Sequence, residues 1–160
     1  MSDILREIRE ELTAIKITPS SEARTMSPPF YTSPEFLDLE EEYIFRKEWV
    51  CLGHSGEIPD SGDYFTTEIV GEQLVVIRGK EGDINVLSNV CRHRGNILLQ
   101  GTGNKSKFSC AYHAWTYDNE GQLLNAPFMD KVPSFDKENC RLPKFNTEIW
   151  NGFILSLIHI

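Results

Sequence analysis

Long apolar runs are absent from the sequence. The longest spans residues 153–158, six positions that include Ser156, whereas a membrane-spanning helix needs about 20. The first ten residues mix charged side chains among the apolar ones, so the unbroken apolar core of a secretory signal is absent too. We therefore expect a soluble, cytoplasmic protein with no membrane partner.

Positive charge and cysteine are also scarce. The chain of 160 residues has 16 Lys and Arg against 24 Asp and Glu, a formal net charge of −8, which argues against a nucleic-acid partner. Its four cysteines fall well below the density of a disulfide-built secreted domain, so metal binding or catalysis is the better first interpretation of them. The length suits one core of ordinary size and excludes a second large domain.

Three segments organise the first 48 residues. Residues 1–16 predict an amphipathic helix, because apolar residues recur there at helical spacing between charged ones. Residues 17–33 are rich in Pro, Ser and Thr and predict a linker or extended arm. A second helix is expected over 34–48, with Ser33 at its cap and Pro34 at its first position.

From residue 49 onward the sequence is typical of antiparallel β-structure. Short runs of β-branched and aromatic residues are separated by turn residues. A hairpin is expected over 64–78 around Gly71 and Glu72, within a mainly β domain that covers 49–154. Further strands are expected at 84–87, 107–109, 114–117, 123–125, 141–145 and 150–155.

Two short loops carry the chemistry. Cys91 and His93 form C-x-H, and Cys110 and His113 form C-x2-H, with sixteen residues between the two motifs. A closed zinc site more often takes two cysteines from one knuckle and two histidines from another. A mixed pair in each loop suits a binuclear [2Fe–2S] centre, in which one iron is held by two Cys and the other by two His. A structural zinc module remains the alternative.

With its flanking residues this pattern resembles the Rieske family, and more closely the large (α) subunit of ring-hydroxylating oxygenases. The likeness rests on 89–95 and 110–117, includes 44–49 and 150–154, and extends over roughly residues 35–154. It implies a Rieske-type antiparallel β-sandwich or barrel with a small cluster-binding subdomain and N-terminal helices.

The resemblance also implies the ligands. Cys91 and Cys110 would bind one iron, and His93 and His113 the other, in cluster-binding loops within residues 90–117. One of the two imidazoles would also hydrogen-bond a carboxylate of a neighbouring subunit and pass the electron toward its catalytic iron.

Four further residues are expected around the cluster. Gly95 lets the first loop turn tightly, and backbone N–H groups near Arg94 and Tyr112 are expected to point at the sulfides. Trp115 is expected to cover the cluster as part of a dry shell. The alternative for Tyr112 and Trp115 is that they are ordinary core aromatics.

Respiratory Rieske proteins carry an additional cysteine in each cluster loop, and neither loop has one here. We interpret Cys51 and Cys140 as ordinary core or surface residues. The midpoint potential is then expected toward the low end of the Rieske range, roughly −150 mV. That value suits an electron acceptor from a ferredoxin or reductase.

The surroundings of the loops are basic. No Asp or Glu occurs from residue 84 to 117, whereas Arg92, Arg94, Lys105 and Lys107 add positive charge. This basic edge is expected to steer an acidic electron donor. The alternative is that these charges only offset the cluster and keep the loops soluble.

An oxygenase of this kind also needs a mononuclear Fe(II) held by two histidines and a carboxylate. Beyond the cluster motifs only His54 and His159 remain, 105 residues apart. We therefore interpret the chain as truncated before the catalytic domain, with an atypical tail over 155–160.

The expected function is electron transfer within a Rieske non-haem iron oxygenase, an oxidoreductase that is usually a homotrimer. Substrates in this family include aromatic acids, hydrocarbons and quaternary amines, and both monooxygenases and dioxygenases occur. The alternative is a free-standing Rieske-type ferredoxin. It is disfavoured because about 60 residues of helix and linker precede the β region.

Overall fold

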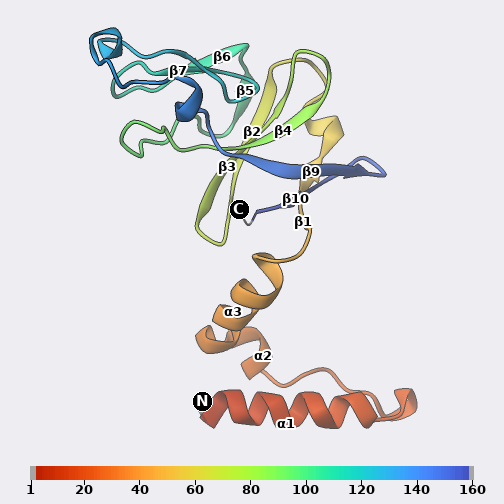
Figure 1. Ribbon diagram of the computed structural model, residues 1–160. Helices are drawn as coiled ribbons and strands as arrows, with labels where there is room; N and C mark the ends of the chain where they lie inside the picture. The colour runs from red at the N-terminus through yellow and green to blue at the C-terminus, as the bar shows by residue number, and fades with distance from the viewer. Residues whose placement is uncertain (1–2, 159–160) are drawn as a thin grey trace. The chain divides into compact units, whose positions relative to one another are not determined.

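The computed structural model describes residues 3–158 (Figure 1). The chain forms two compact units, Met1–Ile44 and Phe45–Ile160. None of the helices within the described residues is long and apolar enough to cross a membrane.

The first unit is helical. Helix α1 (Asp3–Ile17) buries Ile8, and the short helix α2 (Pro29–Thr32) buries Phe30, whose ring meets that of Phe36 edge-on at 5.3 Å. The Ser33 hydroxyl caps helix α3 (Pro34–Glu40) by accepting the Phe36 N–H at 3.2 Å, as its place before Pro34 predicts. The remaining helical elements are η1 (Ser20–Glu22) and η2 (Glu41–Phe45).

The helix expected over 34–48 is interrupted in the structure. Regular α-helix ends at Glu40, and the next turn, η2, is a π-helix. A helical spacing of apolar residues does not reveal where the hydrogen bonds lengthen from four residues to five. The arm over 17–33 likewise contains two short helices, η1 and α2, which its Pro and Ser content did not predict.

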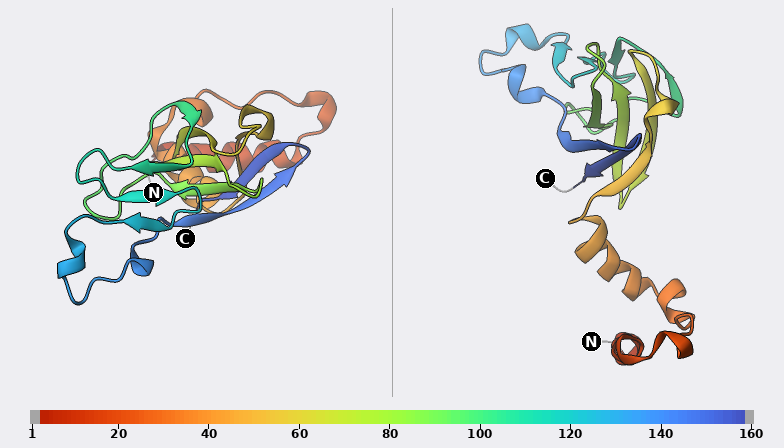
Figure 2. Two further views of the ribbon diagram at one scale, coloured as in Figure 1. Left: turned by 90° about the horizontal axis from the view of Figure 1, so that it is seen from above. Right: turned by 90° about the vertical axis from the view of Figure 1, so that its right-hand side faces the viewer.

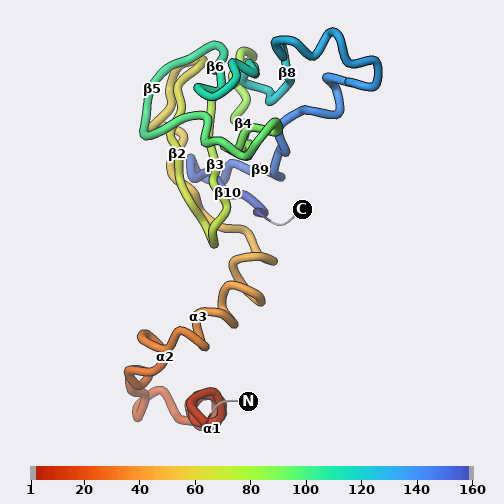
Figure 3. Tube along the Cα trace, turned by 90° about the vertical axis from the view of Figure 1, so that its left-hand side faces the viewer, coloured from red at the N-terminus to blue at the C-terminus, as the bar shows by residue number. Residues whose placement is uncertain are grey.

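The second unit is built on antiparallel β-structure, which confirms the expected fold class. Seven strands form one sheet in the order β1-β10-β9-β4-β3-β2-β5, and three form a small sheet in the order β6-β7-β8. Figures 1, 2 and 3 show the small sheet at one end of the curled larger one. The strands are β1 (Val50–His54), β2 (Asp63–Ile69), β3 (Glu72–Arg78), β4 (Ile84–Ser88), β5 (Thr102–Asn104), β6 (Lys107–Ser109), β7 (Thr116–Asp118), β8 (Leu123–Asn125), β9 (Lys144–Trp150) and β10 (Phe153–Leu157); three single turns, η3 (Ser55–Glu57), η4 (Met129–Lys131) and η5 (Glu138–Cys140), lie between them.

Several strand bounds differ from the expected ones. The β2–β3 turn consists of Val70 and Gly71, both at positive φ, rather than Gly71 and Glu72. Residues 114 and 115 belong to a loop rather than to β7, because Ala114 is at φ +58° and cannot continue a strand. The strands expected at 141–145 and 150–155 are β9 and β10 in the structure, and both begin and end later than expected.

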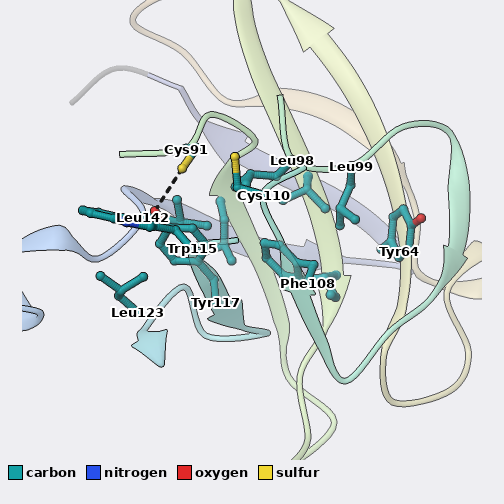
Figure 4. Close-up of a cluster of buried hydrophobic side chains, with 13 residues drawn as sticks. Tyr64, Cys91, Leu98, Leu99, Phe108, Cys110, Trp115, Tyr117, Leu123 and Leu142 are labelled. Atoms are coloured by element: carbon teal, nitrogen blue, oxygen red, sulfur yellow. Dashed lines mark hydrogen bonds between the residues drawn. The ribbon is translucent and has the colours of Figure 1, made fainter. Parts of the chain in front are cut away.

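The core has two sides because strand β3 is buried on both faces. Val75 and Ile77 face one cluster of side chains, and Leu74 and Val76 face the other, all four being fully buried. Residues Cys91 and Cys110 belong to the first cluster (Figure 4). The two loops that carry them are therefore fixed on the hydrophobic core of the domain.

The tail segment continues the sheet. Leu155, Ser156 and Leu157 lie in β10 and pair with Glu148, Thr147 and Asn146 of β9. The buried Ser156 hydroxyl donates to the Asn146 carbonyl at 2.9 Å, and Ile158 is buried after it. His159 and Ile160 lie outside the described residues.

The β9–β10 turn offers a test of the packing. Asn151 (φ +49°) and Gly152 (φ +87°) form its two central residues, and a Cβ at Gly152 would collide with the ring of His54 on β1. Gly152→Ala should lower the free energy of unfolding by about 1–3 kcal/mol from the left-handed backbone alone, with the collision added. Urea denaturation measures the loss.

Gly82→Ala is the matched control, since Gly82 has φ +93° and open space around it. Its free energy of unfolding should fall only by the contribution of the left-handed backbone. Equal losses in the two variants would show that the His54 ring does not confine the turn.

Candidate metal centre

The two loops that follow β4 and β6 share one backbone design. In the first, the Cys91 N–H donates to the Asn96 carbonyl at 2.8 Å and the Gly95 N–H to the Cys91 carbonyl at 3.0 Å. In the second loop, the Cys110 N–H likewise donates to the Trp115 carbonyl at 2.8 Å, and the Ala114 N–H donates to the Cys110 carbonyl at 2.9 Å. Gly95 (φ +69°) and Ala114 (φ +58°) hold the same left-handed position, so each loop turns back over its own cysteine.

These loops bring the four expected ligands together. The rings of His93 and His113 lie 4.7 Å apart between centroids, at 68° to one another. Cys91 and Cys110 are both buried and interact with each other, and Figure 4 shows their sulfur atoms on the two neighbouring loops. Two thiols and two imidazoles therefore meet at one place, although 22 residues separate His113 from Cys91.

The donor set suits a binuclear centre better than a single ion. Within residues 3–158, no group of three or more His, Cys, Asp or Glu side chains is arranged to hold one metal ion. The buried Nδ1 atom of His113 has no hydrogen-bond partner among the described residues, which is costly unless it binds something. A [2Fe–2S] cluster asks only two protein ligands of each iron, so these residues fit it.

The electrostatics favour the neutral imidazole that binds metals. Burial, together with the neighbouring His113 and Arg94, lowers the pKa of His93. Burial raises the pKa of the Cys91 thiol when no metal is bound. A coordinated metal reverses this tendency, because a coordinating thiol is deprotonated outright.

Tyr117 is a site residue that sequence reasoning missed. Its hydroxyl oxygen accepts the Arg92 N–H at 3.2 Å, which leaves its own proton free to point at Cys91 Sγ, 3.5 Å away. Burial and the bond to Cys91 raise the Tyr117 pKa well above its usual value. The signal available in the sequence was its place at the middle of a short strand directly after the second loop, where an aromatic residue is expected to face the core.

Aromatic rings surround both imidazoles. The indole of Trp115 is buried and stacks on His93 at 4.7 Å and 8°. The ring of Tyr112 lies 3.8 Å from that of His113 but is 59% exposed. Trp115 is thus placed to keep water from His93, whereas Tyr112 is a surface residue rather than a core aromatic.

The other candidates lie apart from this centre. His54 is on β1, where its Nδ1 accepts the Gly56 N–H at 3.1 Å and its ring meets Phe153. All four cysteines are free; Cys51 is exposed, and Cys140 is partly buried at the edge of the core that holds Cys91.

The structure divides the expected basic edge. Arg92 and Arg94 are exposed beside His93, but Lys107 lies opposite Asp118 in the β6–β7 pair. Lys105 donates its N–H to the Gly62 carbonyl, next to Asp63. Cross-strand pairing brings acidic residues from outside 84–117 next to both lysines, which a linear count of charges could not reveal.

Removing the Tyr117 hydroxyl should lower the midpoint potential. A hydrogen bond to the Cys91 sulfur stabilises the more negative, reduced state. If this hydrogen bond is about 1 kcal/mol stronger in the reduced state than in the oxidised state, Tyr117→Phe lowers the one-electron potential by roughly 40 mV. Protein-film voltammetry measures it, and an unchanged potential would mean that the hydroxyl does not bond to Cys91 in the loaded protein.

The family model for the Rieske [2Fe-2S] domain matches residues 48–136, which include both loops. This chain belongs to the Rieske [2Fe–2S] domain family. The resemblance expected from its motifs is confirmed, and with it the [2Fe–2S] cluster as the cofactor of the domain.

Relatives of this Rieske domain are oxygenase subunits. It is 43% identical over 133 residues to the carnitine monooxygenase oxygenase subunit of Acinetobacter baumannii, covering 82% of the chain and 36% of that protein. It is 37% identical over 137 residues to the benzene 1,2-dioxygenase α subunit of Pseudomonas putida, covering 84% of the chain and 30% of that protein. The chain thus spans about a third of the length of these relatives.

Solved structures of oxygenases share the fold of this chain. The apo form of a quaternary ammonium Rieske monooxygenase superposes with a TM-score of 0.76 at 41% identity, covering 82% of this chain and 39% of the other. Naphthalene 1,2-dioxygenase from Rhodococcus sp. gives a TM-score of 0.84 at 34% identity, covering 97% of this chain and 35% of the other.

Proposed function

We propose that Cys91 and Cys110 hold one iron of a Rieske [2Fe–2S] cluster, that His93 and His113 hold the other, and that the domain transfers single electrons within an oxygenase large subunit. The observation that carries this is the convergence of two thiols and two imidazoles from two identically built loops. When bound, such a cluster accepts one electron and gives it up again.

The residues of the chain have distinct roles in this proposal. The paired hydrogen bonds in each loop fix the positions of the cysteines before metal binds. Trp115 excludes water beside His93, and Tyr117 donates a hydrogen bond to the Cys91 sulfur. Burial of both cysteines in the core keeps the sulfur end dry.

The oxygenase reaction itself needs more than these residues. The matched regions make up only 36% and 30% of the two relatives named above, and we propose that a mononuclear Fe(II) site lies in a region corresponding to the rest of their length. A reductase or ferredoxin would supply the electrons. A homotrimer would bring the cluster of one subunit near the iron of its neighbour.

Substrate choice is proposed to lie outside this domain. Proteins named for the oxidation of carnitine, benzene and choline all share this region with the chain at 35–43% identity. A region common to enzymes for such different substrates is suited to delivering electrons rather than to selecting substrates.

The metal content of the purified chain tests the proposal. We expect two irons and two acid-labile sulfides per chain, a coloured protein and a paramagnetic signal on one-electron reduction. Bound zinc and a colourless protein would overturn it. The chain alone should consume no dioxygen in a substrate-dependent way; such consumption would contradict the proposal that the catalytic iron lies elsewhere.

A further inference from the structure

Within this chain, the ring of His93 is contacted by stacking. Histidine ligands usually donate their second ring N–H to a carboxylate, carbonyl or water, which fixes the ring orientation. Within residues 3–158, neither ring nitrogen of His93 has a hydrogen-bond partner. Instead the Trp115 indole lies almost parallel to the imidazole, at 4.7 Å and 8°.

Trp115 is itself held from a third segment of the chain. The Phe135 ring meets the Trp115 indole edge-on, with centroids 5.6 Å apart and planes at 64°, a favoured aromatic geometry. Phe135 belongs to the long connection between β8 and β9, outside both cluster loops, and it packs against the core that contains Cys91 and Cys110.

The connection between β8 and β9 folds back on the core on both sides of Phe135. Turn η4 places Met129 against the same core, and the Phe135 N–H donates to the Val132 carbonyl at 3.0 Å in the next turn. Met129, Val132 and Phe135 are among the residues that line a pocket beside this turn, so one side of Phe135 faces open space. On its other side Phe135 packs against the core, where its ring meets the Trp115 indole.

We infer that Phe135 is a positioning residue for the His93 ligand and acts through Trp115. This inference rests on the proposed function, because it requires His93 to bind iron. Shortening Phe135 leaves a cavity at the edge of the indole, and a large side chain next to a cavity relaxes into it. The Trp115 plane then tilts, and the His93 ring that stacks on it turns with it.

Pulsed paramagnetic resonance of the reduced chain tests this, because it resolves the couplings of the two histidine nitrogens. In Phe135→Leu we expect one of the two couplings to shift and the other to stay as in the parent chain. Phe135→Tyr keeps the ring edge and should restore the parent values. Phe128→Leu is the matched control, since Phe128 lies on the same connection but is 84% exposed.

A purely structural role for Phe135 would lower the melting temperature without moving either coupling, and that result in a loaded Phe135→Leu chain overturns the inference. If leucine lowers the iron content, Phe135→Met replaces it, because the unbranched methionine side chain adapts better to an irregular gap. Failure of the proposed function is distinct: the parent chain would then show no pair of histidine nitrogen couplings.

Discussion

Replacing His93 by cysteine is expected to lower the midpoint potential by roughly 100 mV while two irons and two sulfides are retained. All-cysteine clusters have potentials near −400 mV, whereas Rieske centres, in which two imidazoles replace two thiolates, have potentials of about −150 mV and above. A single exchange should produce about half of that difference, because it adds one negative charge to one iron. Potentiometric titration followed by absorption measures it.

The matched control is His54→Gln. His54 lies on β1 against Gly56 and Phe153 and takes no part in the centre, so its substitution should leave the midpoint unchanged. An unchanged midpoint in His93→Cys, with an unaltered visible spectrum, would mean that His93 is not a ligand.

Replacing Cys110 by alanine is expected to abolish iron binding. Cys110 is buried next to Cys91, and its loop is closed by hydrogen bonds to Trp115 and Ala114, so no other thiol can take its place without rebuilding the loop. The iron content of the purified variant, measured by elemental analysis, should fall from two per chain to background.

Cys140→Ala provides the comparison. Cys140 lies at the edge of the same core and is also a free cysteine, so the two variants differ in position rather than in chemistry. It should keep both irons. Equal iron content in the Cys110 and Cys140 variants would contradict the proposed ligand set.

Much of the candidate site was predictable because its chemistry is local in sequence. Each loop supplies one thiolate and one imidazole within a few residues, and a spacing of that kind marks a metal site before any fold is known. The left-handed turn at Gly95 was predictable as well, since glycine favours it. Its counterpart at Ala114 was not, because alanine rarely adopts that conformation and gives no sign of it in the sequence.

The parts that were missed depend on contacts across the fold. The Tyr117 hydroxyl reaches Cys91 over 26 residues, and Phe135 reaches Trp115 over 20. The linear count of charges places Lys107 in a basic edge, whereas strand pairing sets it opposite Asp118. Alternation and composition describe which residues are buried, but not which side chains meet once strands from different hairpins are paired.

The two irons are proposed to have different ligands, and the Mössbauer spectrum of the ⁵⁷Fe-loaded, one-electron-reduced chain tests this. We predict two distinct iron sites of equal intensity, one ferric with sulfur ligands only and one ferrous with histidine nitrogen ligands. Two sites with the parameters of all-sulfur coordination, or a single iron per chain, would show that His93 and His113 do not hold one iron of a binuclear cluster.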